Sequence, residues 1–155
     1  AYTVYDDDDD SPSFAPYCPG DCSDIFGNLY NWYAAETQQL CMDGWHVPAK
    51  DEWTILFDYL GGESVAGGKM KEEGHEHWDS PNIAATNESG FTGLPAGRIF
   101  NGSYGDMGKY TNFWSSSESN IDEAWTRWLS CYYSYLGSSK TLKQPYGFSV
   151  RCLKD

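Results

Sequence analysis

Positive charge is scarce in this chain. Ten Lys and Arg residues stand against 23 Asp and Glu residues, which gives a formal net charge of −13 at pH 7. Nucleic acids and anionic membrane surfaces attract basic proteins rather than acidic ones. Long apolar runs are missing too, since none approaches the roughly 20 residues of a membrane-spanning helix. We therefore expect no nucleic-acid partner and no membrane insertion by this segment.

Firm metal-ligand patterns are also missing. The acidic run Asp6–Asp10 lacks the D-x-D-x-D-G spacing of an EF-hand loop, which favours a solvated tip over a calcium site. His75 and His77 have acidic neighbours but no third ligand at a firm spacing, and no C-x-x-C pair is present. We expect no metal and no cofactor, with calcium at the acidic run as the alternative.

Catalytic patterns are equally sparse. The serines at 115–117 have neither a nucleophile-elbow context nor a partnered histidine, so hydrolase chemistry is disfavoured. His46 is expected to be a hydrogen-bonded structural histidine rather than a base. We expect no catalytic residue, and hence no enzyme.

What the chain has in quantity is aromatic residues, with 12 Tyr and seven Trp. They crowd most densely in "WTRWLSCYYSYLGSS" (125–139), which we expect to begin within a strand over 124–135. Side chains of a strand leave on alternating faces. One face should therefore carry Trp125, Arg127, Leu129 and Cys131, and the other Thr126, Trp128, Ser130 and Tyr132.

The rest of the pattern predicts an α+β domain over 24–155, preceded by a Pro-broken acidic segment over 1–23 with "YTVY" as a candidate edge strand. Helices are expected over 28–40 and 48–62. The second has one apolar stripe, but Ala49 stands where a Ser or Asp cap is usual. Gly- and Asn-rich loops follow over 63–112, and strands over 124–135 and 146–155 close a small antiparallel sheet.

Six strings carry a family resemblance. They are "GNLYNWYAA" (27–35), "GWHVPAKDEW" (44–53), "TNESGFTGLPAG" (86–97), "FWSSSE" (113–118), "AWTRWL" (124–129) and "GFSVRCLKD" (147–155). The chain resembles the Fibrobacter succinogenes major paralogous domain family, which is common in exported proteins of gut bacteria. That family is similar to C-type lectin-like domains of the formylglycine-generating-enzyme type. The resemblance implies two helices, a small antiparallel sheet and a long loop-rich insertion.

Five cysteines stand at positions 18, 22, 41, 131 and 152, so at least one thiol is left over. Dispersed cysteines in such a chain are typical of exported proteins with one or two disulfides. The resemblance implies a Cys41–Cys152 bridge, and the short loop between Cys18 and Cys22 can close a second one, which leaves Cys131 free. We expect an extracellular or cell-surface location, on a bacterial lipoprotein or a phage.

The resemblance also implies that Trp125 and Leu129 belong to the core, which leaves the other aromatics for the surface. Tyr and Trp bring large, rigid contact area, and Ser brings adaptable hydrogen bonding, as in binding surfaces. We therefore expect a ligand-binding surface that recognises a protein or a cell-surface molecule. Its expected residues are Asn120, Thr126, Trp128, Ser130, Tyr132, Tyr133 and Tyr135.

Three alternatives stay open at this point. The tyrosines could instead pack under the loops of 63–112. The chain could be a fixed structural or adhesin module of a surface lipoprotein or fibre. A formylglycine-generating oxidase is disfavoured because that chemistry uses reactive cysteines in a cleft, and only Cys131 is left for it.

Some family members also resemble the variable proteins of diversity-generating retroelements. These elements rewrite adenines near the 3′ end of a gene and turn Asn codons mainly into codons for Tyr, Ser, Asp, His and Cys. The string "SCYYSYLGSS" (130–139) has an excess of Tyr and Ser, and it includes Cys131, which has no counterpart in the family pattern. A diversified surface near residues 120–140 is one hypothesis, and a fixed surface is the other.

Overall fold

A computed structural model describes residues 3–4, 13–15 and 23–155 of the 155-residue chain. The acidic run Asp6–Asp10 and the expected Cys18–Cys22 bridge lie outside these residues. The helices in this part of the chain are α1 (Ser23–Phe26), α2 (Trp32–Glu36), α3 (Lys50–Tyr59) and α4 (Glu63–Met70). The strands are β1 (Thr3–Val4), β2 (Ser13–Ala15), β3 (Leu29–Tyr30), β4 (Trp45–His46), β5 (Arg98–Phe100), β6 (Ser103–Gly105), β7 (Tyr110–Glu118), β8 (Glu123–Ser130), β9 (Gly137–Leu142), β10 (Tyr146–Gly147) and β11 (Leu153–Lys154).

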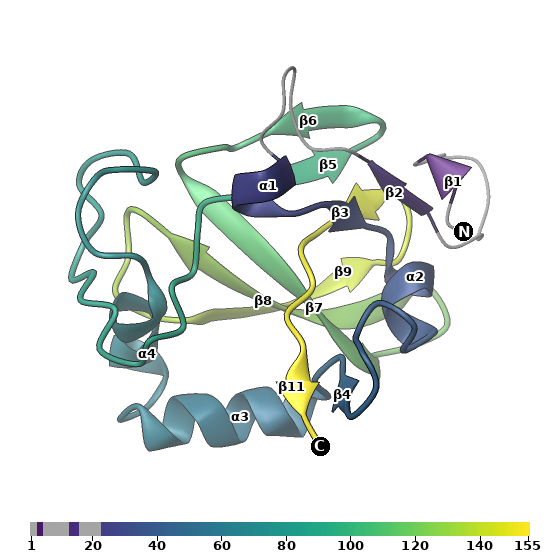
Figure 1. Cartoon of the computed structure of the whole chain (residues 1–155), viewed down its shortest axis with the longest axis horizontal. Coiled ribbons are helices and arrows are strands. Elements are labelled where there is room, and N and C mark those ends of the chain that lie inside the picture. The colour runs from purple at the N-terminus through teal and green to yellow at the C-terminus, as the bar shows by residue number, and fades with distance from the viewer. Residues whose placement is uncertain (1–2, 5–12, 16–22) are drawn as a thin grey trace.

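The centre of the molecule is the antiparallel sheet β7-β8-β9. Helix α3 lies on one side of this sheet, and the small β10-β5-β6 sheet lies on the other (Figure 1). Two further small sheets, β1-β2-β3 and β11-β4, complete the strand pairing of the described residues. The arrangement confirms an α+β fold with small, mainly antiparallel sheets.

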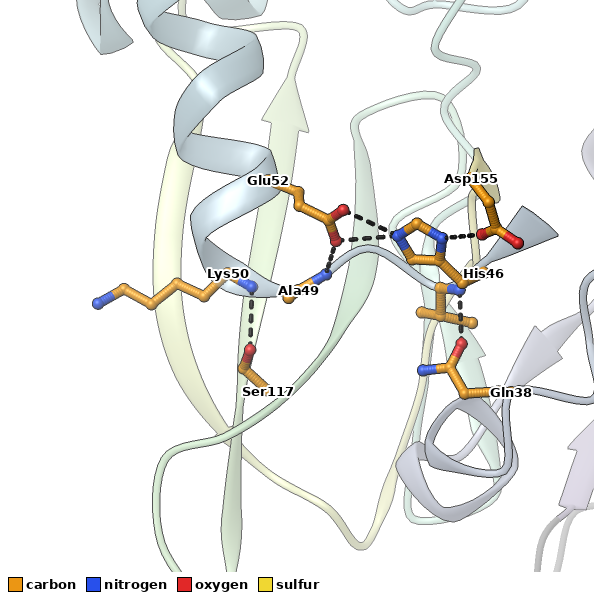
Figure 2. A network of polar contacts seen from close by, with 8 residues as sticks. Gln38, His46, Ala49, Lys50, Glu52, Ser117 and Asp155 are labelled. Atoms are coloured by element: carbon orange, nitrogen blue, oxygen red, sulfur yellow. Dashed lines mark hydrogen bonds and ion pairs between the residues drawn. The ribbon is translucent and has the colours of Figure 1, made fainter. Parts of the chain in front are cut away.

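Helix α3 confirms the predicted apolar stripe with tighter ends than 48–62. Its Trp53 and Phe57 are buried in a core cluster with Phe113 of β7 and Leu129 of β8. Ala49 has no side-chain acceptor to cap the helix. The hydroxyl of Ser117 accepts the Lys50 N–H instead (3.0 Å), and the Glu52 carboxylate accepts the Ala49 N–H (2.8 Å; Figure 2). A side chain from β7 thus replaces the missing cap.

The expectation of two helices is wrong, because α1 and α4 are present as well, and the stretch expected as loops over 63–112 also contains β5, β6 and the start of β7. Helix α4 is the longer of the two omitted helices. This helix contains Gly67 and Gly68, and glycine disfavours helices by about 1 kcal/mol relative to alanine. A Cβ added to Gly67 would lie 2.3 Å from the carbonyl oxygen of Tyr135. The glycine is therefore needed for close backbone approach, a tertiary requirement that no sequence period reveals. The helix expected over 28–40 is likewise shorter, because α2 spans only Trp32–Glu36.

The Cys41–Cys152 bridge is present, and Cys131 is a free, buried cysteine, as predicted. Next to the bridge, β11 pairs with β4, and His46 lies between the carboxylates of Asp155 (2.6 Å) and Glu52 (2.9 Å; Figure 2). His46 is thus the hydrogen-bonded histidine that was expected. The C-terminal strand is therefore held near the start of α3 by the disulfide, by the β4–β11 strand pairing and by the hydrogen bonds of the His46 imidazole.

The aromatic strand is shorter than expected, since β8 ends at Ser130 and a turn follows. Leu129 is fully buried, but Trp125 is only partly buried, with the ammonium groups of Lys50 and Lys140 at 4.2 and 5.3 Å from its ring. The core position expected for Trp125 is therefore wrong, since its ring lies against Lys50 at the start of α3 and belongs to none of the buried clusters of the described residues. The segment 146–155 likewise divides into β10 and β11. In the part of the chain that the structure describes, no helix combines the length and apolar character needed to cross a bilayer.

Candidate ligand-binding surface

The two faces of the central sheet differ in what covers them. Residues paired directly across antiparallel strands share a face. One face, here called the helix face, carries the pairs Phe113–Arg127 and Thr111–Leu129 and packs toward α3. The other, here called the open face, carries the pair Asn112–Trp128, with the pairs Tyr110–Ser130 and Trp114–Thr126 on either side of it.

Trp128 is the largest side chain at the centre of the open face and is half-buried. It pairs with Gly137 of β9, and a Cβ added to that glycine would lie 1.9 Å from the indole ring. The ring therefore lies against bare backbone, which is possible only because residue 137 has no side chain. The indole N–H donates to the hydroxyl of Ser139 (3.2 Å). One face of the ring and its N–H are thus fixed by β9.

Around Trp128 gathers a group of rings, here called the aromatic cluster. Trp128 contacts Tyr135 (ring centroids 5.4 Å apart), Tyr133 (6.2 Å) and Tyr110 (6.2 Å). Tyr133 stacks on Tyr135 at 4.9 Å, and Tyr132 lies 6.2 Å from Tyr110. Despite these contacts, Tyr132, Tyr133 and Tyr135 keep 40%, 41% and 37% of their surface exposed. The five rings form one continuous, partly wet aromatic surface.

The backbone that carries these tyrosines is held from beneath by Lys71. This lysine is fully buried, and its ammonium donates to the carbonyl oxygens of Ile83 (2.8 Å), Ser130 (2.9 Å) and Tyr133 (2.9 Å). Burial lowers the pKa of Lys71 to about 8, because the charged form loses its water. The ammonium is nevertheless protonated at neutral pH and connects the end of β8 to residues 131–136, here called the tyrosine turn.

Helix α4 supplies further bonds to the same turn. The Gly68 N–H donates to the carbonyl of Ser134 (2.7 Å), and the carbonyl of Glu63 accepts the Leu136 N–H (3.0 Å). The backbone of 131–136 is therefore fixed while its tyrosine side chains project outward. A surface that is ordered before binding loses less conformational entropy on binding.

A pocket of about 390 Å³ adjoins the aromatic cluster on the open face. Its aromatic walls are Tyr110, Trp128, Tyr146 and Phe148. Its polar walls are Arg98, Asp106, Asn112, Ser139 and Thr141. Tyr110 and Trp128 belong to both features, so the pocket and the cluster form one continuous candidate site.

Comparison with known proteins places this arrangement in a family. A family model, the Fibrobacter succinogenes major domain, matches residues 3–154. The chain belongs to that family. No curated protein and no solved structure matches the chain.

In this Fibrobacter succinogenes major domain, the expected site residues divide into three groups. Trp128, Tyr132, Tyr133 and Tyr135 lie together in the aromatic cluster. Thr126 and Ser130 share the open face with Trp128, but they are 1% and 0% exposed, so the expectation that they reach the surface is wrong. The Thr126 hydroxyl is used internally, bonding to the Thr141 hydroxyl (3.2 Å). Alternation identifies a face but not whether another element covers it.

Asn120 is exposed but lies in the turn between β7 and β8, at the far end of β8 from the cluster. Its carboxamide oxygen accepts the N–H groups of Asp122 and Glu123 (2.9 Å each), and its amide donates to the Glu123 carboxylate. The residue shapes the hairpin turn and is separated from the other predicted residues.

Sequence reasoning missed the pocket residues outside 124–135. Asn112, Ser139 and Thr141 reach the site through strand register with Trp128, Thr126 and Ala124, respectively. No local signal pointed to them, because Asn112 fell in the expected loops, Ser139 and Thr141 fell in no expected strand, and strand register depends on tertiary pairing.

Two further groups are notable in the domain. Glu72, Glu76 and His77 bring their side-chain ligand atoms within 4.8 Å of one another, and the Glu72 carboxylate already bonds to His77 Nδ1 (2.8 Å). These are donor types that a transition metal accepts.

Cys131 is fully buried, and burial raises the pKa of its thiol. A buried, protonated thiol is a poor nucleophile.

Proposed function

We propose that this chain is a noncatalytic module that binds a protein or cell-surface ligand through the aromatic cluster. The observation that carries the proposal is the exposure of Tyr132, Tyr133 and Tyr135 on a turn whose backbone is fixed. Aromatic side chains concentrate binding energy at interfaces, and a tyrosine has few torsions to freeze. A rigid display of such rings favours recognition over packing.

The alternative in which the tyrosines fill the interior has less support. Each of the three keeps more than a third of its surface exposed, and the backbone of the segment that carries them bonds to α4. A folding role would be served better by burial, since hydrophobic stabilisation grows with the area removed from water.

The noncatalytic part of the proposal rests on the cysteines. An oxidase of the formylglycine-generating type needs reactive thiols in a cleft. Cys41 and Cys152 are joined to each other, and Cys131 is buried with a raised pKa. None of these three is available as an accessible thiolate.

The finer family assignments belong to the same proposal. We infer a C-type lectin-like fold of the formylglycine-generating-enzyme type. We also infer an extracellular or cell-surface location, which the disulfide supports because disulfides persist in oxidising compartments. The exposed turn also suits a segment that a diversity-generating retroelement rewrites, because exposed substitutions usually cost within about 0.5 kcal/mol. A fixed adhesin or structural module is the second candidate, in which the same rings face one constant partner.

Flanking DNA separates the diversified from the fixed form. A second, near-identical copy of the segment coding for 113–155, differing mainly at adenines and lying beside a reverse transcriptase gene, is expected for a diversified module. A flank without such a copy would leave the fixed module.

Binding to bacterial cells tests the proposal directly. Labelled protein is incubated with fixed cells of a gut bacterial community, and cell-bound label is measured by flow cytometry. The variant Tyr132→Ala/Tyr133→Ala/Tyr135→Ala should lose binding while it keeps the wild-type melting curve. Tyr59→Ala is the matched control, because Tyr59 is 86% exposed and lies on α3, far along the chain from the cluster. Equal binding by the triple variant and the wild type would contradict the proposal.

A further inference from the structure

The pocket beside the aromatic cluster has walls of two kinds. Its volume of about 390 Å³ falls within the range of about 300–1,000 Å³ that is usual for small-molecule sites. Aromatic rings from β7, β8 and β10 line one part, and hydroxyl, amide and charged groups line the rest. A purely hydrophobic ligand would leave the polar groups without partners, which disfavours it.

The aromatic wall is held in place before any ligand arrives. The Trp128 indole rests on Gly137 and donates its N–H to Ser139, so neither that ring face nor that N–H is offered to the pocket. The Tyr146 ring contacts the rings of Phe100 (centroids 4.8 Å apart) and Phe148 (5.4 Å) in a tilted geometry. What remains for a ligand is carbon surface with a negative π face, which suits the slightly positive C–H groups of a saturated ring.

The polar wall offers both donors and acceptors. Within the described residues, the Asn112 carboxamide makes no hydrogen bond, although it lies directly across from Trp128 in the strand pairing. An amide brings two donors and one acceptor oxygen. The Ser139 hydroxyl accepts from Trp128 and so keeps its own proton to donate. The Thr141 hydroxyl, on the same strand, bonds to the Thr126 hydroxyl and can make a further hydrogen bond.

The charges of the pocket cancel. Arg98 and Asp106 form an ion pair with 2.7 Å between Nε and the carboxylate. Among the residues that the structure describes, no other Lys, Arg, His, Asp or Glu lines the pocket. A charged ligand would therefore have to break this pair to find a counter-ion, and an anion would also approach a chain of net charge −13.

We propose that this pocket binds one neutral sugar ring of a cell-surface glycan. A pyranose has C–H groups for the Trp128 and Tyr146 side of the pocket and hydroxyls that both donate and accept toward Asn112, Ser139 and Thr141. The inference rests on the proposed function, because it names the ligand class that the neighbouring cluster would help to recognise. The aromatic cluster would contact the next residue of the glycan or the protein that carries it.

Titration with simple glycosides tests the inference. The probes are the methyl glycosides of glucose, galactose, mannose and N-acetylglucosamine at millimolar concentration, and amide chemical shifts of labelled protein are the readout. At least one glycoside should shift resonances of β7, β8 and β9 at saturating concentration. The uronic acid of the same sugar should bind more weakly, because its charge has no partner. The absence of any shift, or tighter binding of the uronic acid, would overturn the inference.

Two variants locate the binding. Asn112→Ala and the nearly isosteric Thr141→Val should each weaken the glycoside about fivefold to tenfold, as expected for loss of one hydrogen bond. Tyr59→Ala on α3 should leave the affinity within about twofold, as is usual for a distant surface change. Unchanged affinity in both pocket variants would overturn the assignment. If one of them is too unstable to measure, unchanged affinity in the other has the same consequence.

The two proposals fail separately. If no glycoside binds while the triple tyrosine variant loses binding to cells, the aromatic cluster stands and the sugar pocket falls. If glycosides bind and the triple variant still binds cells as the wild type does, the pocket stands and the proposed role of the cluster falls.

Discussion

The two faces of the β7-β8-β9 sheet both carry aromatic residues but differ in how far those residues are buried. On the helix face, Phe113 and Leu129 disappear under Trp53 and Phe57 of α3. On the open face, Trp128 is left half-buried beside a pocket, and three tyrosines stay exposed. Aromatic content therefore does not distinguish the core from the proposed binding surface in this molecule. The two surfaces differ in whether a helix packs over the aromatic rings.

The largest stability effect is expected from the disulfide, which joins the C-terminal segment to the region before α3. Cys41→Ser/Cys152→Ser should lower the free energy of unfolding by about 4–5 kcal/mol, because the bridge closes a loop of 111 residues. Urea denaturation of the variant against the wild type gives the value. Wild type treated with a reducing agent should match the variant, and a loss below about 1 kcal/mol would show that β4, β11 and His46 hold the C-terminus without the bridge.

Exchanging one tryptophan on each side sharpens the comparison. Trp53→Ala should cost about 3–5 kcal/mol of stability, as expected for a buried Trp. Trp128→Ala should cost clearly less than Trp53→Ala, because part of its surface is already exposed to solvent, yet it should abolish ligand binding. Chemical denaturation of both variants is the measurement. Equal destabilisation would mean that the open face is core as well.

The seating of Trp128 can be disturbed without touching Trp128. Gly137→Ala would place a methyl group inside the indole ring and should cost about 1–3 kcal/mol. The ring should also move, which near-ultraviolet circular dichroism detects. Gly105→Ala is the matched control, because nothing lies within 4 Å of its added Cβ and its backbone is not left-handed. Identical spectra for Gly137→Ala and the wild type would contradict the described contact.

The smallest of these stability effects is expected from the titration of His46, which bonds to the C-terminal residue Asp155. Hydrogen bonds to Asp155 and Glu52 raise the folded pKa of this imidazole above 6.5. Its contribution is therefore fully present below pH 6.5, the unfolded value, and is lost as pH rises through the folded pKa. Melting temperatures of the wild type should fall over this window relative to His46→Gln. The series is kept below pH 8, since Lys71 titrates at about 8; parallel curves would contradict the assignment.

Neither face is expected to need a metal. Addition of a chelator should leave the melting temperature almost unchanged, because the contacts described above that hold the elements together are a disulfide, hydrogen bonds and apolar packing. A drop of several degrees, reversed by calcium or zinc, would instead point to the group of Glu72, Glu76 and His77 or to the acidic run.

Local patterns predicted the parts of this fold that local physics determines. The apolar stripe of α3 was legible because burial repeats every three to four residues. Helix α4 was not, because Gly67 exists to admit the backbone of a segment far along the chain. The same limit applies to the site. The sequence indicated Trp128 and the three tyrosines by composition, whereas Asn112 joined them only through strand register, and the burial of Thr126 and Ser130 depended on what packs above them.

The buried ammonium of Lys71 has a consequence beyond stability. Three carbonyl oxygens converge on it, much as they would on a coordinated metal ion, but this cation is tethered to the chain next to α4 and cannot diffuse away. Its occupancy is therefore independent of the ionic composition around the protein. The shape of the tyrosine turn should stay constant in media that would empty a calcium loop, and it should loosen only in alkaline conditions that remove the proton, at a pH above about 8.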